Sequence, residues 1–328
     1  MKICILGGYS GLLDEGMTNV SYNVYENLHS IYTDLFQLNV RTAYNIKFWK
    51  DIIAIGPDII HYFQGPTLKG LILVKLIQLL TGSRSVISAT KPVVPKYFKT
   101  ISFLLKPDIM IVQSKKSENI FESVKYKTAF IPNGVDIDKF TPVSSEKKQE
   151  LRKKYGFDEK DFIVLHIGPL RNSRNQRSLL QLSDVKVLLV VSITNPSEEL
   201  AYQELIKTKI TIWREYFPNI QELYSLADIY IFPVFEELNS IEIPLSVLEA
   251  MSCNLPVITT RYGALERILQ EGEGLFFIDK QEQIQELIRE IKNGKYKIDT
   301  RRKIESLSWK NIVKDISLIY EHLLHEKC

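Results

Sequence analysis

The segment from Asn219 to Glu266 holds the residues whose types and spacing best suit chemistry. Pro244 precedes an apolar helical pattern, and we expect it to be the first residue of a helix, where its missing N–H costs nothing. The backbone amides of Leu245, Ser246 and Val247 would then point out of the helix end, where the helix dipole favours negative charge. The sequence therefore predicts a phosphate-type anion site at this terminus.

Glu249 follows in the second turn of the same predicted helix, among Leu245, Leu248, Met251 and Cys253. A carboxylate on so apolar a helix is costly to bury unless it is paired. Two interpretations stay open. Either Glu249 holds vicinal hydroxyls, such as those of a ribose, or it complements the helix dipole and faces water.

The histidines and cysteines give weaker signals. His166 alternates with apolar residues inside a strand pattern and is expected in the core, and His61 at the end of another strand is more typical of a structural residue. Cys4, Cys253 and Cys328 are widely separated and lack metal spacing, which favours reduced thiols in a cytoplasm.

The small net charge of +3 is unevenly distributed. Residues 1–142 carry 16 Lys and Arg against 11 Asp and Glu, and no acidic residue occurs from Ile59 to Pro107. This basic stretch suits a phosphate-bearing ligand or an anionic bilayer, or it is an ordinary solvated face. The most apolar window, Leu68–Leu80, is too short to span a membrane.

Short β-type runs alternate with helical patterns, which is typical of parallel βαβ units. In the first half we expect strands at 3–6, 58–62, 85–89, 108–112 and 128–131, and helices at 19–29, 68–80, 96–105 and 114–124. In the second half we expect strands at 162–167, 185–191, 210–213, 229–232, 256–259 and 274–278.

A polar, Pro-flanked segment at 132–160, ending in a charged helix at 146–155, separates the two series and marks the domain boundary. We therefore predict an α/β protein with Rossmann-like domains at 1–142 and 143–308 and a final helix at 309–328. In such sheets ligands bind at the carboxyl ends of the strands, which predicts a cleft between the halves.

The loop Gly7-Gly8-Tyr9-Ser10-Gly11 lacks the glycine spacing of the dinucleotide fingerprint. No acidic residue closes a second strand about 20 residues later. A nicotinamide-dependent enzyme is therefore not favoured.

Taken together, these motifs resemble family 4 glycosyltransferases of the GT-B architecture. In that family a helix begins beneath the donor diphosphate and a Glu within it holds the ribose. Further matches occur in the same order along the chain: Ile131–Asp136 with Phe140, Glu150–Gly156, Val164–Gly168, Ser308-Trp309 and Ile319-Tyr320. The resemblance is dense over the C-terminal half and loose over the N-terminal half.

The resemblance implies two cations on the diphosphate, and this chain departs from the pattern there. Gly168 is followed by Pro169 in place of the family's arginine, whereas Arg174 stands where a lysine is expected. Arg171 is a candidate for the missing charge, because guanidinium forks suit phosphate oxygens. The alternative is that Arg171, Arg174 and Arg177 merely solvate a loop.

A second departure concerns the transferred sugar. The family pairs the ribose-binding Glu with another Glu eight positions earlier, and that position is Ile241 here. Glu242, one residue away, is the candidate replacement. Relatives also carry a His after the strand at 85–89, where this chain has Thr90-Lys91.

The resemblance implies transfer of a hexose-type sugar from a nucleoside diphosphate, such as UDP or GDP, to a glycan or lipid-linked acceptor, with retention and without a metal or cofactor. Glu242 and Arg174 would act at the reacting centre. The nucleotide-sugar donor would be bound by Leu245, Ser246, Val247, Glu249, Arg171, the Gly16 loop and Tyr216. Asp136-Ile137-Asp138 has metal-like spacing but lies in the linker motif, so we interpret it as loop structure.

We expect a cytoplasmic protein without a signal peptide or a nucleic-acid partner. Its basic stretch at 59–107 would contact the inner face of a membrane, with the acceptor near Lys96, Tyr97, Phe98, Lys99, Phe103 and Lys106. Two alternatives remain: a nucleotide-sugar-binding protein that has lost transfer activity, and a nucleotide-sugar epimerase on the same fold.

Overall fold

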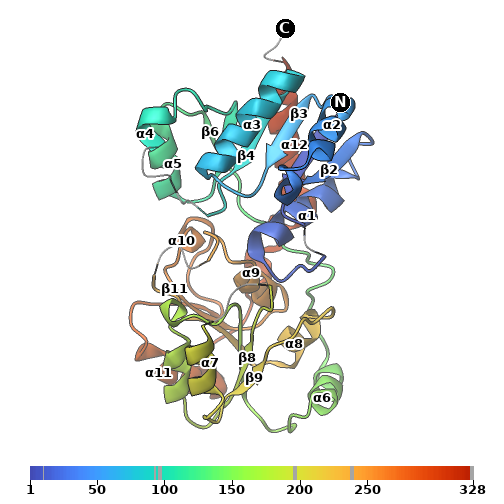
Figure 1. The fold of residues 1–328 in the computed structure, drawn as a ribbon. Coiled ribbons are helices and arrows are strands. Elements are labelled where there is room, and N and C mark those ends of the chain that lie inside the picture. The colour runs from blue at the N-terminus through green and yellow to red at the C-terminus, as the bar shows by residue number, and fades with distance from the viewer. Residues whose placement is uncertain (10, 92–93, 95–97, 195–197, 237–239, 326–328) are drawn as a thin grey trace. The chain divides into compact units, whose positions relative to one another are not determined.

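The computed structural model describes residues 1–328 except 10, 92–93, 95–97, 195–197, 237–239 and 326–328 (Figure 1). The chain forms two compact units. The first comprises Met1–Gly134, Ser240–Ile243 and Trp309–Cys328, and the second comprises Val135–Asn239 and Pro244–Ser308. The first boundary thus lies at Gly134, eight residues before the predicted one, and a four-residue segment of the second half belongs to the first unit.

The first unit is built on a parallel six-stranded sheet in the order β2-β1-β3-β4-β5-β6. Its strands are β1 (Ile3–Gly7), β2 (Leu35–Asn39), β3 (Ile59–Tyr62), β4 (Arg84–Ser88), β5 (Ile109–Val112) and β6 (Thr128–Phe130). Its helices are α1 (Gly16–Leu28), α2 (Ile46–Ile55), α3 (Leu68–Thr81), α4 (Phe98–Ile101), α5 (Lys115–Glu122) and α12 (Trp309–His325).

The pattern of apolar runs predicted five of these strands to within a residue or two. It missed β2, because only Leu35 in that strand is fully buried and the edge position leaves the rest partly exposed. The helix expected at 96–105 is shorter, with α4 limited to Phe98–Ile101 within the described residues.

The final helix packs into the first unit through a buried polar contact. The Tyr320 hydroxyl lies 2.6 Å from Nδ1 of His61, and Nε2 of His61 lies 2.8 Å from the Ser88 hydroxyl. Burial lowers the pKa of His61 to about 3, so the ring is neutral. His61 is therefore a structural residue that joins β3, β4 and α12.

The second unit has its own parallel sheet in the order β12-β11-β10-β7-β8-β9. The strands are β7 (Ile163–Ile167), β8 (Lys186–Val190), β9 (Thr211–Trp213), β10 (Ile229–Phe232), β11 (Val257–Thr260) and β12 (Leu275–Ile278). The principal helices are α6 (Ser145–Lys154), α7 (Glu199–Leu205), α8 (Gln221–Leu226), α9 (Leu245–Ser252), α10 (Leu265–Ile268) and α11 (Gln283–Lys292). The α/β prediction with two Rossmann-like halves is confirmed.

The strand order of the second sheet locates where a ligand should bind. Counted from β7, the order is the doubly wound 3-2-1-4-5-6 arrangement, which reverses direction between β7 and β10. Loops leave a parallel sheet in opposite directions at such a switch point and open a crevice at the carboxyl ends of its strands. This edge of the second unit is therefore the first place to look for a site.

Candidate functional site

Arg174 lies at the switch point, in a single turn of 3-10 helix (Asn172–Arg174) that follows β7. Its side chain is buried, with its guanidinium carbon 5.3 Å from the centre of the Phe232 ring at the end of β10. Gly168 gives it this space: with φ of +153°, a Cβ at Gly168 would come within 2.6 Å of Nη2 of Arg174. The Gly-Pro pair is thus compatible with a cation at this corner.

Burial lowers the pKa of Arg174, and the charge of Arg171 adds to the effect. The two guanidinium groups therefore lie near enough to repel each other. Arg171 is half-buried, whereas Arg177 is exposed and paired with Glu204. Arg174 is buried and so does not merely solvate a loop, whereas that alternative stays open for Arg171 and fits the exposed Arg177. The binding of a diphosphate by Arg171 and Arg174 stays a prediction.

Helix α9 begins at Leu245, and Pro244 is its N-cap rather than its first residue, with φ −63° and ψ 122°. The prediction was wrong by one position. The Val247 amide donates to the Pro244 carbonyl at 3.2 Å, so it does not point out of the helix as expected. Leu245 and Ser246 precede the first intrahelical bonds and remain the candidate anion-binding amides.

Glu249, in the second turn of α9, is partly buried and accepts a hydrogen bond of 2.6 Å from the Tyr224 hydroxyl. Burial raises the pKa of Glu249, and the bond from Tyr224 and the charge of Lys139 oppose that rise. The carboxylate is therefore paired, as burial on an apolar helix requires. One phenol occupies one lone pair, which leaves acceptor capacity for the hydroxyls of a ligand.

Tyr230 in β10 connects the two halves of this site. Its hydroxyl lies 3.5 Å from the carbonyl oxygen of Ile167 at the end of β7. Burial raises the pKa of Tyr230, contact with Ser246 and the charge of Arg174 lower it, and the charge of Glu249 raises it. Arg174, Ser246 and Glu249 therefore all influence the Tyr230 phenol, whose hydroxyl lies at the carboxyl end of β7.

The residues beneath α9 were not identified as a support in the sequence. Arg301 donates to the carbonyl oxygens of Ile137, Phe140 and Ser252 at 2.9, 2.9 and 2.6 Å, and the Ser252 hydroxyl also donates to Phe140. Phe140 packs edge-on against Tyr224 with ring centres 5.6 Å apart. Through these contacts Arg301, Ser252 and Phe140 hold Tyr224 under Glu249. The role of Arg301 could not be predicted, because a single arginine distant in sequence forms no recognisable pattern.

Glu242 has a different environment from the one expected. It belongs to the first unit and is buried, where its carboxylate accepts from the Ser114 amide at 3.1 Å, the Ser117 hydroxyl at 2.7 Å and the Ser114 hydroxyl. Its own amide donates to the Thr90 carbonyl at 2.8 Å. Burial raises the pKa of Glu242, and these hydrogen bonds oppose the rise. The carboxylate is thus held by the N-cap serine and the first turn of α5, and its role toward a sugar stays a prediction.

The N-terminus of helix α1 is likewise capped by a side chain, that of Glu15. Gly16 is the first helical residue, and the carboxylate of Glu15 accepts from the amides of Met17 and Thr18 at 3.1 and 2.7 Å. Ile241 packs on Gly16, with Cδ1 3.2 Å from the position of a Cβ. The first-turn amides of Met17 and Thr18 are therefore already bonded to Glu15, so they are not the groups with which the Gly16 loop would contact a nucleotide sugar.

Tyr216 lies away from the switch point. His166 and Asp136 make contacts that stabilise the fold of the second unit. Tyr216 follows β9, the edge strand, which β8 separates from β7. His166 is buried, contacts the Ile231 carbonyl at 2.8 Å and has a pKa lowered to about 3 by burial, which confirms its core position. Asp136 accepts from the Asp138 and Lys139 amides, which is loop structure.

The residues predicted to contact a membrane differ in their environments. Lys96 and Tyr97 lie outside the described residues, as does the side chain of Lys99. Phe98 is buried in the core of the first unit, so its predicted surface role is wrong. Phe103 is 71% exposed and Lys106 is exposed.

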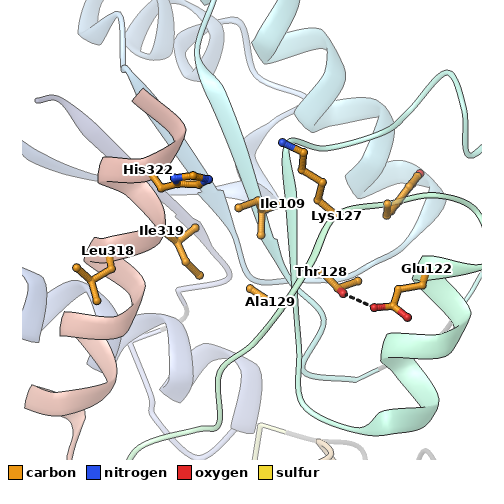
Figure 2. Close-up of a pocket in the computed structure, with 9 residues that line it drawn as sticks. Ile109, Glu122, Lys127, Thr128, Ala129, Leu318, Ile319 and His322 are labelled. Carbon is orange, nitrogen blue, oxygen red and sulfur yellow. Dashed lines mark hydrogen bonds between the residues drawn. The ribbon is translucent and has the colours of Figure 1, made fainter. Parts of the chain in front are cut away.

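A pocket of about 650 Å³ lies elsewhere in the first unit, between α12 and the strands β5 and β6 (Figure 2). Leu318, Ile319 and His322 approach it from the helix, and the Thr128 hydroxyl donates to Glu122 at 3.1 Å beside it. Ile109 and Thr128 are the first residues of their strands, so the pocket is at the amino end of the sheet. Its lining residues belong to the first unit, whereas the switch-point residues belong to the second.

Comparison with known proteins agrees with the geometry. Residues 147–306 match the model of the family described as glycosyl transferases group 1. The chain is 29% identical over 154 residues to the putative glycosyltransferase EpsD of Bacillus subtilis, covering 44% of this chain and 39% of that protein. It is 22% identical over 253 residues to the alpha-galactosylglucosyldiacylglycerol synthase of Streptococcus pneumoniae, covering 70% and 63% respectively. The chain thus spans between about two fifths and two thirds of these relatives.

Solved structures show the same fold over nearly the whole chain. Anabaena Alr3699/HepE in complex with UDP-glucose aligns with a TM-score of 0.75 at 17% identity, covering 99% of this chain and 100% of that one. Sucrose-phosphate synthase from Thermosynechococcus elongatus aligns with a TM-score of 0.79 at 14% identity, covering 99% and 100%. The predicted GT-B fold is confirmed. Within the described part of the chain, every helix is too short or too polar to cross a bilayer.

Proposed function

We propose that the protein transfers a hexose-type sugar from a nucleoside diphosphate to a glycan or lipid-linked acceptor, because residues 147–306 match the model of the group 1 glycosyl transferases. Retention of the anomeric configuration and independence from a metal are part of the proposal. The similar structure of Alr3699/HepE is a complex with UDP-glucose, which supports a nucleotide-sugar donor for this protein.

The observation that carries the proposal is the convergence of a buried cation, a helix N-terminus and a paired carboxylate at one switch point. Arg174 and the start of α9 both lie beside Tyr230, and Glu249 is one turn further along the helix. A nucleoside diphosphate has the matching groups in the matching order: phosphates for the cation and amides, and ribose hydroxyls for the carboxylate.

The same groups suit the chemical step. Negative charge grows on the diphosphate as the glycosidic bond breaks, and groups fixed in place before reaction stabilise it without reorganisation. Arg174, with Arg171, and the amides of Leu245 and Ser246 supply that stabilisation. Glu249 orients the nucleoside. No step in this scheme requires a metal ion.

The first unit offers a polar edge for an acceptor. Three buried side-chain atoms at the carboxyl ends of β3, β4 and β5 have no hydrogen-bond partner among the described residues: Nε2 of Gln64, the hydroxyl of Thr90 and Oε1 of Gln113. Unsatisfied buried polar groups are costly, so they favour a ligand rich in hydroxyls. This supports a carbohydrate-bearing acceptor.

Binding of nucleotides tests the donor site. A thermal-shift screen with UDP, GDP, ADP and TDP should raise the melting temperature for one base, because a ligand at a hundredfold excess over its Kd stabilises the folded state by about 2.7 kcal/mol. The Glu249→Gln variant should weaken binding of that nucleotide but not of its 2′-deoxy analogue, which lacks a hydroxyl for the carboxylate. Glu286→Gln, an exposed change on α11, is the matched control. Equal weakening of both nucleotides would contradict the ribose contact.

A second candidate function rests on the environment of the residue expected at the sugar. Ile241 is apolar and packed on Gly16, and the carboxylate of Glu242 is engaged by serines. Both observations favour a protein that binds the nucleotide sugar with little transfer. Release of the nucleoside diphosphate in the presence of acceptor extracts separates the two, because a binding protein gives a thermal shift and no turnover.

A further inference from the structure

Helix α3 is apolar on almost every side, yet it lies on the surface of the first unit. Leu71, Val74 and Ile77 face the core and are fully buried. A helix that is apolar all round is normally buried on all sides, because its outer face otherwise exposes hydrocarbon to water. The outer face of α3 therefore calls for a partner.

The exposed side is a continuous strip. Residues at helical spacing along it are each at least 40% exposed, and Leu79 reaches 72%. They occupy an arc of about 120° on the outside of the helix, the width of an amphipathic face. The strip consists of Leu68, Ile72, Leu76, Leu79 and Leu80.

Helix α2 packs beside α3 (Figure 1) and has exposed apolar side chains of its own. Ile46 and Ile53 are 72% and 53% exposed, and Lys50 stands between them on the same helical face. We call these residues and the α3 strip together the α2–α3 face. Isolated exposed apolar residues are ordinary, but a contiguous set on two adjacent helices marks an interaction surface.

The charged residues of α3 itself are of one sign. Lys69 is exposed within it, Lys75 is half-buried at its border, and α3 contains no acidic residue. On α2 the nearest acid, Asp51, is half-buried and off the Ile46–Ile53 side. Hydrocarbon with lysines at its margin matches the boundary between acyl chains and anionic headgroups.

We infer that the α2–α3 face docks the protein on the surface of an anionic lipid bilayer, with leucines inserted among the acyl chains and lysines against lipid phosphates. A second copy of this chain is disfavoured as the occupant, because a two-fold contact would bring lysines of α3 toward each other without acids to pair them. The inference does not depend on the proposed transfer activity.

Vesicle flotation of the full chain tests it, with phosphatidylcholine alone and phosphatidylcholine mixed with phosphatidylglycerol. The protein should float with the mixed vesicles and be released by salt, because the lysine attraction is screened. Lys50→Gln and Lys69→Gln should each weaken partitioning about five-fold. Leu76→Gln with Leu79→Gln should weaken it at least ten-fold while changing the melting temperature little, since the two side chains are 44% and 72% exposed.

Two matched controls lie on α12 of the same unit: Leu318→Gln, which changes a leucine 63% exposed, and Lys314→Gln, which changes an exposed lysine. Both should bind vesicles as the unchanged protein does. Absence of flotation with mixed vesicles, or equal loss in the α12 controls, would overturn the inference. A concentration-dependent dimer that the Leu76 and Leu79 changes abolish, without vesicle binding, would assign the face to a second copy instead.

Discussion

Replacement of Glu242 by Gln isolates the contribution of one buried carboxylate. In the first unit its Oε1 accepts from the hydroxyls of Ser114 and Ser117, and its Oε2 accepts from the Ser114 amide at 3.1 Å. A glutamine oxygen can keep the hydroxyls, but its NH₂ group then faces the Ser114 N–H. Two donors confront each other in a site that is 6% exposed.

The size of the effect follows from that clash. An unsatisfied buried donor costs about 1–3 kcal/mol, which lowers the melting temperature of a domain of this size by about 2–10 °C. The loss depends on pH. Because the pKa of Glu242 is raised in the folded protein above its usual 4.5, its stabilising contribution is complete in acid and declines as pH rises through the raised value. The deficit of the Gln variant is therefore largest at low pH.

A double-mutant cycle tests the reasoning. Ser117→Ala removes one hydroxyl that donates to Glu242, so the combined variant should lose at least 0.5 kcal/mol less than the two single losses together. Ser123→Ala, at the exposed end of α5, removes a bond to the Ile120 carbonyl and should be additive with the Gln change. Additivity for Ser117 as well would refute the contact. If Glu242 instead binds the sugar, Glu242→Gln abolishes turnover while Ser117→Ala leaves it intact.

Three further predictions concern the nucleotide site of the second unit and His61 of the first. Gly168→Ala should weaken nucleotide binding about ten-fold or more, because its Cβ displaces Arg174, whereas Gly156→Ala, also at positive φ but beside open space, should not; calorimetric titration measures both. Tyr224→Phe should raise the pKa of Glu249 by removing its hydrogen bond, so the loss of nucleotide affinity on acidification, followed by titration at several pH values, should begin at higher pH. The pKa of His61 falls from 6.5 to about 3 on folding, so its stabilising effect is complete above 6.5 and lost as pH drops; the melting temperature of His61→Phe should decline less steeply in acid.

Much of the architecture could be predicted because it depends on local patterns. Buried parallel strands are continuous apolar runs, and β10 (Ile229–Phe232) was delimited to the residue. The helix after Pro244 followed from propensity, but whether proline is the N-cap or the first helical residue depends on its ψ angle of 122°, which composition does not determine. The prediction that the Val247 amide points out of the helix end was accordingly wrong.

Contacts between residues far apart in sequence could not be predicted in the same way. Glu242 meets Ser114 across 128 positions and Arg301 meets Phe140 across 161, and no periodicity connects such pairs. Arg174 was identified through the family resemblance, at the position where a lysine is expected, yet its burial depends on Gly168 having no side chain. The sequence thus indicated which residues could bind phosphate, and the packing decided which of them face the switch point.

The departure from the family pattern at residue 241, with a carboxylate at 242 instead, has one physical explanation. Helix α1 begins at Gly16, and its first-turn amides are already neutralised by the carboxylate of Glu15. A glutamate at 241, packed where Ile241 contacts Gly16, would bring a second negative charge to that end and leave it without a donor. One position later, the carboxylate of Glu242 reaches the hydroxyls of Ser114 and Ser117 and the Ser114 amide at the start of α5, where the helix dipole favours negative charge. The apolar residue at 241 and the carboxylate at 242 are therefore a matched pair, and restoring the family's glutamate alone would recreate the repulsion rather than the site.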